Sequence, residues 1–266
     1  MKLGVIGCGK MGGALLGGII RSGICRADET YVFDVYAPSA QSLADELGVN
    51  VADSNQAVVD ASDAVLLCTK PQGFVDMLGS LGPAENRLLI SIAAGIQIST
   101  IERQVESQGH RVIRVMPNTP ALVGKGASGY ALGTAATEGD AQFAESLLGS
   151  VGYAARVSEP DLDAVTALSG SGPAYVFLMI ENLISTAVSQ GLEPDVARQL
   201  AVMTVAGAAE MVAATGEDPA ILRENVTSPN GTTFAALESF RENGFPRIVT
   251  EALTAARDRS IELGKS

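Results

Sequence analysis

Histidine is almost absent from this sequence. His110 is the single histidine among 266 residues, and it lies in the polar segment 107–111, where we expect a loop and a solvated side chain. A Ser-His-Asp hydrolase needs a histidine beside its nucleophile, and a multi-histidine metal site needs several. Both classes are therefore close to excluded, and we predict no metal site.

Cysteine is also scarce. Cys8, Cys25 and Cys68 are odd in number, scattered and without the spacing of metal ligands. They indicate reduced thiols in a cytoplasmic protein, not a disulfide framework. The first predicted strand begins at residue 1, so no signal peptide is expected.

Positive charge falls short of negative charge, with 18 Lys and Arg against 30 Asp and Glu and a net charge of −12. This balance argues against binding to nucleic acid or to an anionic membrane. The nearest candidate for a membrane span, residues 173–188, is short and interrupted by Glu181 and Asn182, so we predict a buried helix there. Hydrophobic residues make up 47% of the chain, enough for the cores of one large or two medium domains.

A glycine-rich turn lies close to the amino terminus. Residues 7–12 read Gly-Cys-Gly-Lys-Met-Gly, after an apolar run typical of a buried strand and before a helical pattern. In dinucleotide-binding turns the first glycine allows the tight turn, the second lets the pyrophosphate approach the backbone, and the third lets helix and strand pack closely. The helix start then offers free N–H groups to the phosphates. We predict a dinucleotide site; a βα turn without a ligand is the alternative.

Strands and helices alternate through the first 158 residues, which is the signature of a doubly wound sheet. Strands are predicted at 1–6, 30–34, 49–51, 64–68, 88–92, 112–116, 128–132 and 153–157. Beyond residue 160 only helices are predicted, at 161–167, 173–190, 194–215, 219–226, 233–243 and 246–263, several of them started by proline and followed by glycine. The chain is therefore predicted to be an α/β Rossmann-type domain over residues 1–158, followed by an all-α domain over residues 159–266.

Two of the predicted helices, 173–190 and 194–215, are apolar or small nearly all round. Such helices need cover on every side. The small helical domain cannot easily provide it, so another subunit is expected to cover them.

Polar groups follow several predicted strands, at the sheet edge where open α/β sheets bind ligands. Asp34 ends the second strand 22 residues after Gly12, close to where a Rossmann acid binds the adenosine ribose; an ordinary turn acid is the alternative. Lys70 could place positive charge near the cofactor, or it could be an exposed turn lysine. The small residues 93–95 would let a flat nicotinamide come near the chain.

Two segments of the second half are rich in hydroxyl groups and glycine. They are 167–175 (Ala-Leu-Ser-Gly-Ser-Gly-Pro-Ala-Tyr) and 225–234 (Asn-Val-Thr-Ser-Pro-Asn-Gly-Thr-Thr-Phe). We expect each to be a loop that opens a helix, exposes free N–H groups and suits a small carboxylate. For either segment alone, a plain helix cap is the alternative.

At these residues the sequence resembles the pyrroline-5-carboxylate reductase family, over essentially the whole chain. The resemblance runs through residues 7–12, 69–71, 93–95, 115–120, 168–175 and 222–237. It implies NAD(P)H-dependent reduction of 1-pyrroline-5-carboxylate to L-proline, the last step of proline biosynthesis. It also implies a helical domain that interlocks with its twin in a homodimer, and dimers that often assemble into decamers.

The resemblance also assigns roles to single residues. Predicted cofactor-binding residues are Ile6, Gly7, Cys8, Gly9, Lys10, Met11, Asn55, Thr69, Lys70 and Ala94, together with Asp34 from the strand spacing and Pro71 beside Lys70. The substrate carboxylate would meet Ser228, Gly231, Thr232 and Thr233. The Thr233 hydroxyl corresponds to the group that approaches the ring nitrogen in the family, and it is the predicted catalytic residue.

The scarcity of histidine and lysine agrees with this chemistry. A protonated cyclic imine is already an electrophile, so hydride addition needs positioning more than a strong acid. Reduction of a ketone builds an alkoxide, which usually needs a His or Lys donor, and after Lys125 the only lysine is Lys265. Thr233 is therefore predicted to hydrogen-bond the ring nitrogen, not to act as a strong general acid.

Two other functions remain open at this point. β-Hydroxyacid dehydrogenases also combine a Rossmann domain with helices, but they carry a catalytic lysine where this chain has Val176. The other alternative function is a non-catalytic module that binds NADP and signals through its helical surface.

As cofactor we expect NADPH, with NADH also used. Segment 34–39 contains no Arg or Lys and Asp34 would repel a 2′-phosphate, although Tyr36, Ser39 and Asn55 could hydrogen-bond it.

Overall fold

The computed structural model describes residues 1–82, 86–105 and 109–265. Internal contacts divide the chain into two compact units: Met1–Ser171 together with Ala256–Ser266, and Gly172–Ala255. Strands give way to helices at the expected residue 158, and the domain division placed there stays a prediction. Each unit is described by itself below.

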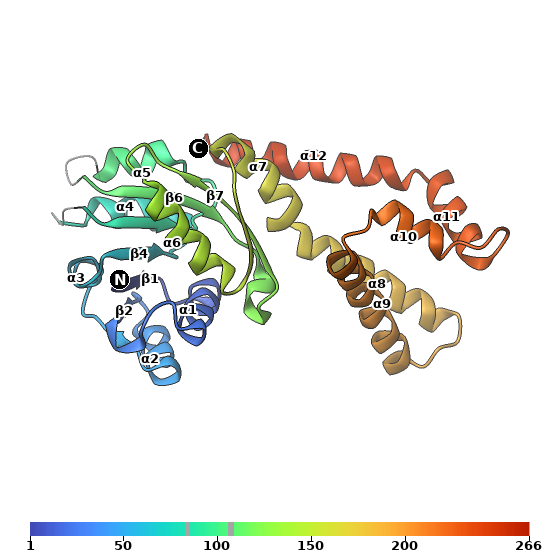
Figure 1. Cartoon of the computed structure of the whole chain (residues 1–266), viewed down its shortest axis with the longest axis horizontal. Helices are drawn as coiled ribbons and strands as arrows, with labels where there is room; N and C mark the ends of the chain where they lie inside the picture. Colours follow the sequence, from blue (N-terminus) through green and yellow to red (C-terminus); the bar gives the residue numbers. More distant parts are fainter. Residues whose placement is uncertain (83–85, 106–108, 266) are drawn as a thin grey trace. The chain divides into compact units, whose positions relative to one another are not determined.

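The first unit is built on an eight-stranded sheet with the order β3-β2-β1-β4-β5-β6-β7-β8 (Figure 1). Neighbouring strands are parallel, except that β6 and β7 are antiparallel. The predicted doubly wound α/β fold is thus confirmed, with one antiparallel pair added. The strands are β1 (Leu3–Ile6), β2 (Thr30–Phe33), β3 (Asn50–Val51), β4 (Ala64–Leu67), β5 (Leu88–Ser91), β6 (Arg111–Met116), β7 (Gly126–Leu132) and β8 (Gly152–Arg156).

Helices cover both faces of the sheet (Figure 1). On one face α1 (Lys10–Ser22), α2 (Ala37–Leu47) and α6 (Glu138–Gly149) share one cluster of buried apolar side chains. On the other, α3 (Asn55–Ala61), α4 (Phe74–Gly79) and α5 (Ile98–Val105) share a second cluster. Along β1, Val5 belongs to the first cluster and Ile6 to the second. A parallel strand covered on both faces must be apolar throughout, which explains the uninterrupted apolar runs of β1 and β4.

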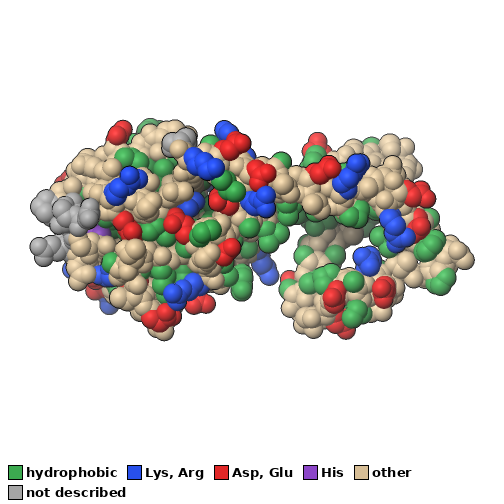
Figure 2. Space-filling model, turned by 90° about the horizontal axis from the view of Figure 1, so that it is seen from above, with side chains coloured by type: hydrophobic (Ala, Val, Ile, Leu, Met, Phe, Trp, Pro, Cys, Tyr) green, Lys and Arg blue, Asp and Glu red, His purple; other side chains and the backbone are tan. Residues whose placement is uncertain are grey.

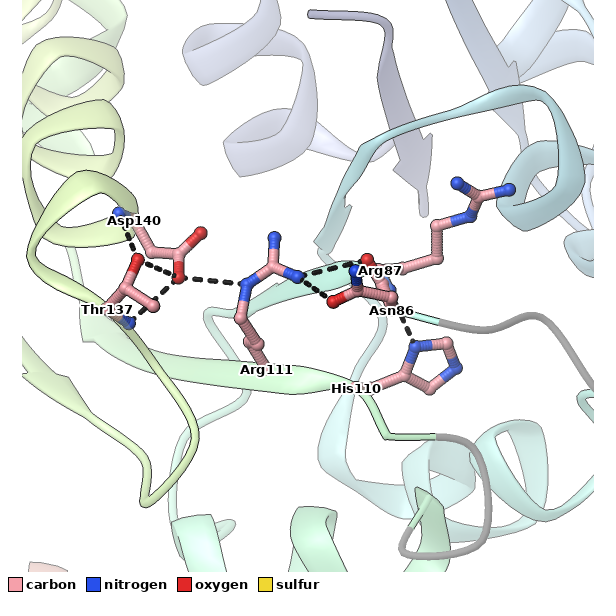
Figure 3. A network of polar contacts seen from close by, with 6 residues as sticks. All are labelled: Asn86, Arg87, His110, Arg111, Thr137 and Asp140. Atoms are coloured by element: carbon pink, nitrogen blue, oxygen red, sulfur yellow. Dashed lines mark hydrogen bonds and ion pairs between the residues drawn. The ribbon is translucent and has the colours of Figure 1, made fainter.

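The sequence led us to expect a solvated His110 side chain, and that expectation is wrong. Its side chain is only 5% exposed, and its Nδ1 accepts a hydrogen bond from the backbone N–H of Arg87 at 3.1 Å (Figure 3). Burial, followed by the positive charges of Arg87 and Arg111, lowers the His110 pKa. The residues next to His110 in sequence are polar, and nothing in them predicted a contact with Arg87, which precedes β5.

Next to His110, Arg111 joins three parts of the first unit (Figure 3). Its Nε donates to Asp140 Oδ2 at 2.9 Å, and its Nη1 donates to the backbone carbonyl of Asn86 at 3.0 Å and to the Asn86 side-chain oxygen. Asp140 in turn belongs to the capping box of α6, where it accepts the N–H and the hydroxyl of Thr137 at 2.8 and 2.7 Å. The network therefore links β6 to the start of α6 and to the segment before β5.

A π-helical turn, Thr166–Gly170, follows α7 (Leu162–Val165). We expected a loop with free N–H groups here, and that expectation is wrong: the Ser171 N–H donates to the carbonyl of Thr166 at 2.8 Å. The Ser169 carbonyl accepts a hydrogen bond from Asn118 Nδ2 at 3.0 Å. Asn118 is buried, and its Oδ1 accepts the Ala127 N–H. Glycine and serine are therefore accommodated by a wider helical turn instead of a break.

The second unit is helical, and all its residues are described. It contains α8 (Gly172–Ser189), α9 (Pro194–Thr215), α10 (Pro219–Asn225), α11 (Thr232–Glu242) and the first part of α12 (Phe245–Leu263). These bounds confirm the predicted helices to within about two residues.

In the first unit, short 3-10 turns occur at Ala27–Glu29, Pro71–Gly73, Thr119–Val123 and Glu159–Asp161.

The two apolar helices of this unit are largely exposed in the single chain. α8 has no buried residue, and α9 has only Ala197 and Ala201. Phe177 and Met203 are 63% and 68% exposed, and Figure 2 shows hydrophobic side chains at the surface of this part (right). The expected burial of segment 173–188 is therefore not met within one chain. By length and composition alone, α9, with a mean hydropathy of 1.3, could also span a membrane.

Candidate functional site

The carboxyl ends of three strands meet at one edge of the sheet. Ile6 is in register with Phe33 of β2 and with Leu67 of β4, so the residues that follow these strands lie next to one another. The strand order also reverses between β1 and β4. In open α/β sheets this switch point is where ligands bind.

The glycine-rich turn has the geometry predicted for it. Gly7 has φ +99°, which favours glycine. A Cβ on Gly12 would lie 2.2 Å from the Gly7 carbonyl oxygen, so only glycine lets the helix pack this closely. A Cβ on Gly9 would meet no atom within 4 Å, because this glycine faces open space. The turn therefore combines a tight bend with a backbone that a ligand can approach.

A pocket of about 510 Å³ lies at this edge. Seven of the predicted cofactor residues line it: Ile6, Gly7, Gly9, Asp34, Asn55, Thr69 and Lys70. Phe33, Val35, Cys68, Gln72, Gly73 and Met77 also line it and were not predicted. They are sequence neighbours of predicted residues or, for Met77, lie on α4 just beyond them. The spacing of strand ends could have indicated the neighbours of Asp34 and Pro71, whereas nothing in the sequence indicated Met77.

The other predicted cofactor residues are not among those that line the pocket. Cys8 is buried, and burial together with the charge of Asp34 raises its thiol pKa to about 12, so the thiol stays protonated and unreactive. Lys10 and Met11 form the first residues of α1. Pro71 begins a 3-10 turn, and Ala94 is exposed in the turn after β5.

The polar groups around the pocket fit a nucleotide. α1 begins behind Gly9, which has no side chain to cap the helix, so the helix start can receive a phosphate. The Thr69 hydroxyl is buried and, within the described part of the chain, has no hydrogen-bond partner, a position that a bound polar group would satisfy. Lys70 adds positive charge. These are features of the chain itself and do not depend on a resemblance.

The predicted substrate residues lie on one turn and the helix start that follows it, in the second unit. The Gly231 N–H donates to the Ser228 carbonyl at 3.0 Å, and Gly231 precedes α11, which starts at Thr232. The sequence suggested that Gly231 frees the backbone, but Gly231 has φ −81° and Asn230 takes the left-handed conformation, with φ +59°. Asn tolerates this conformation better than most residues. Thr232 is exposed and Thr233 is half-buried.

Metal binding and thiol reactivity have little support in the described residues. Across residues 1–82, 86–105 and 109–265, no group of three His, Cys, Asp or Glu side chains could hold a metal ion. Cys25 and Cys68 are free thiols, and burial raises the pKa of both.

Two family models match the chain. Residues 159–263 match a model described as pyrroline-5-carboxylate reductase dimerisation, and residues 2–95 match one described as NADP oxidoreductase, coenzyme F420-dependent. Among solved structures, a pyrroline-5-carboxylate reductase from Coxiella burnetii covers 100% of this chain and 99% of its own, with 32% identity and a TM-score of 0.93. A pyrroline carboxylate reductase from Plasmodium falciparum with NADP bound covers 99% and 98%, with 32% identity and a TM-score of 0.88.

Curated relatives are more similar still in sequence. The pyrroline-5-carboxylate reductase of Methanosarcina acetivorans is 43% identical over 99% of this chain and 98% of its own length. That of Pisum sativum is also 43% identical, over 98% and 95%. With this identity along nearly the entire length, and with the glycine-rich turn and helical unit described above, the chain belongs to the pyrroline-5-carboxylate reductase family.

Proposed function

We propose that this protein reduces the C=N bond of 1-pyrroline-5-carboxylate to give L-proline, with NADPH as the preferred cofactor and NADH also accepted. The observation that carries the proposal is the pocket at the ends of β1, β2 and β4, where the open glycine-rich turn, the unpartnered Thr69 hydroxyl and Lys70 come together. The reduced nicotinamide supplies the hydride when it is bound.

In the first unit, the chain's task is to bind and orient the cofactor. The backbone of residues 6–11 and the start of α1 would hold the pyrophosphate, because N–H groups at a helix start favour anions. Asn55, Thr69, Lys70 and Ala94 would line the rest of the nucleotide. Positioning of this kind supplies much of the rate of a reaction between two bound partners.

In the second unit, the Ser228–Thr233 segment would hold the substrate. Ser228 and Thr232 would offer hydroxyl and N–H groups to the carboxylate, at the start of an 11-residue helix. Gly231, whose N–H is bonded to the Ser228 carbonyl, forms the turn between them. The Thr233 hydroxyl would hydrogen-bond the ring nitrogen and keep the imine carbon in place for hydride addition. No strong acid is required, which suits a half-buried threonine.

We further propose that the second unit forms a homodimer. The matched family model describes dimerisation, and α8 and α9 expose Phe177 and Met203 to solvent in one chain. A partner subunit, not lipid, would then cover α9. A decamer, a cytoplasmic location and the absence of nucleic-acid or membrane partners stay predictions.

The direct test follows NADPH oxidation by the purified protein through its absorbance with 1-pyrroline-5-carboxylate as substrate. We expect turnover with the imine and none with 3-hydroxy acids and NADP⁺. Turnover of a hydroxy acid would favour the β-hydroxyacid dehydrogenases, and cofactor binding without any turnover would favour a sensing module. Either result would overturn the proposal.

A further inference from the structure

The carboxylate of Asp34 is held in a fixed position inside the cofactor pocket. Its Oδ2 accepts the backbone N–H of Cys8 at 2.7 Å, and its Oδ1 accepts the backbone N–H of Tyr36 at 2.8 Å. The first of these donors belongs to the glycine-rich turn, and the second to the segment after β2. Both bonds are short, as expected for a charged acceptor, so Asp34 ties the turn to the end of β2.

The pocket that contains this carboxylate has little positive charge in its lining. Lys70 is the one basic residue among the described residues that line the pocket. Residues 35–39, which follow Asp34, read Val-Tyr-Ala-Pro-Ser and carry no charge. A second negative group placed next to Asp34 would therefore be repelled.

The end of the second strand of a Rossmann domain is where the adenosine ribose of a dinucleotide lies. There an acid can hydrogen-bond the free 2′-hydroxyl of NADH. In NADPH the same oxygen carries a phosphate, which needs a cation or neutral donors nearby. The pocket offers Lys70 as a cation, Asn55, Thr69 and Gln72 as neutral donors, and Asp34 as a repelling charge.

We infer that Asp34 is the specificity-determining residue for the nucleotide: it holds the glycine-rich turn through the Cys8 N–H, and its charge penalises the 2′-phosphate. Asp34 thereby limits the preference for NADPH and keeps NADH usable. This inference rests on the proposed function only in assuming that the pocket binds a nicotinamide dinucleotide.

The two roles of Asp34 can be separated by binding two nucleotides that differ only in the 2′-phosphate. We would measure dissociation constants of AMP and adenosine 2′,5′-bisphosphate for the wild-type protein, Asp34→Asn and Asp34→Ser by calorimetry. Loss of the bond to Cys8 should weaken both nucleotides by a similar factor. Loss of the charge should tighten binding of the bisphosphate relative to AMP by about tenfold.

Asp45→Asn is the matched control. Asp45 is exposed on α2, outside the pocket lining, and accepts a hydrogen bond from Gln41 at 2.8 Å. This variant removes one negative charge from the same unit, so it should leave the ratio of the two dissociation constants unchanged. The ratio of kcat/KM for NADPH to that for NADH should rise in Asp34→Asn by about the same factor as the binding ratio.

A ratio that stays within about twofold of wild type in both folded Asp34 variants would overturn the inference. If both nucleotides bind and the ratio shifts, but 1-pyrroline-5-carboxylate is not reduced, the inference holds and the proposed reaction fails. If neither nucleotide binds the wild-type protein, the pocket is no nucleotide site and both fail.

Discussion

Asp140 shows how much a single side chain can connect. It closes the capping box of α6 and forms an ion pair with Arg111 of β6. Its side chain is only 7% exposed. Burial alone would raise the Asp140 pKa, but hydrogen bonds from Thr137 and Arg111 outweigh it and lower the pKa below its ordinary value of 3.8. The folded state therefore favours the charged form.

Asp140→Asn should lower the free energy of unfolding by about 1–2 kcal/mol at pH 7. Because the folded pKa lies below the unfolded one, this stabilisation is complete above about pH 4 and is lost as the pH falls through the folded value. Urea denaturation of both proteins at pH 7 and near pH 3 would show the difference shrinking with acid. Glu138→Gln, at a 70%-exposed partner of Arg156, is the control and should cost less than about 1 kcal/mol.

Thr233→Ala should lower kcat/KM for the imine by several-fold to about a hundredfold, as expected for the loss of one hydrogen bond worth ~1–3 kcal/mol. Steady-state kinetics would measure it. Thr233→Ser keeps the hydroxyl and should keep most of the activity. An unchanged rate in the alanine variant would contradict the role assigned to Thr233.

Residues at strand ends could be predicted from sequence more readily than residues in contact across the fold. Asp34 and Lys70 follow apolar strands, and parallel strands bring their carboxyl ends to one edge, so the sequence predicted their position there, and both line the pocket. The buried His110 accepts a hydrogen bond from the backbone N–H of Arg87, 23 residues earlier in the chain, and no local sequence pattern indicates that contact. Asn230 adopts the left-handed conformation, which asparagine does less often than glycine. The prediction that the neighbouring Gly231 provides the unusual backbone conformation was therefore wrong.

Among the elements, long periodic helices and apolar strands were predicted well, and irregular ones were not. α5 was not named, although Ile98, Ile101 and Val105 form a buried stripe at helical spacing that could have revealed it. The π turn at Thr166–Gly170 could not have been predicted, because two glycines and two serines usually indicate a break. What favours the wider turn is tertiary: Asn118 donates to the Ser169 carbonyl, and Met116 lies where a Cβ on Gly170 would be.

The last turns of α12 belong to the first unit. The Ser260 hydroxyl is buried and donates to Asp163 of α7 at 2.6 Å. Leu263 lies against Gly95, which has φ +77° in the turn after β5. The end of α12 thus supports the turn that contains Ala94, a residue predicted to contact the cofactor.

Ser260→Ala should lower the free energy of unfolding by about 1–2 kcal/mol, because Asp163 would lose a buried partner. Hydrogen exchange in residues 93–97 should also become faster, since the supporting helix end is loosened. Ser239→Ala, at an exposed serine of α11, should change stability by less than about 0.5 kcal/mol. Equal stability of the two variants would show that the contact contributes little.

At the scale of the whole molecule, the exposed apolar side chains of α8 and α9 are the clearest sign of assembly. Single exposed apolar residues are ordinary, but large contiguous patches mark interaction sites. α8 and α9 present Phe177, Leu178, Leu200 and Met203, each at least 55% exposed in one chain. Association was predictable from the composition of these helices, whereas the number of subunits was not.

Met203→Glu should weaken the proposed dimer by at least tenfold in dissociation constant, because a buried unpaired charge costs several kcal/mol. Light scattering during gel filtration, over a range of protein concentrations, would measure it. Val123→Glu places the same charge at a 76%-exposed apolar residue of the first unit, and it should leave the dimer intact. A Met203→Glu protein that remains as dimeric as wild type would place the interface elsewhere.

The first unit is made of two separate stretches of the sequence, because residues from Ala256 onward belong to it together with Met1–Ser171. During translation the sheet and its helices emerge first, yet Ser260 and Leu263 can reach α7 and the turn after β5 only after the intervening residues 172–255 have been synthesised. Domains that fold as they leave the ribosome usually do so in sequence order. Here the nucleotide-binding unit must wait for the intervening helices, and a ribosome stalled before codon 256 would carry a nascent chain whose first unit is still incomplete.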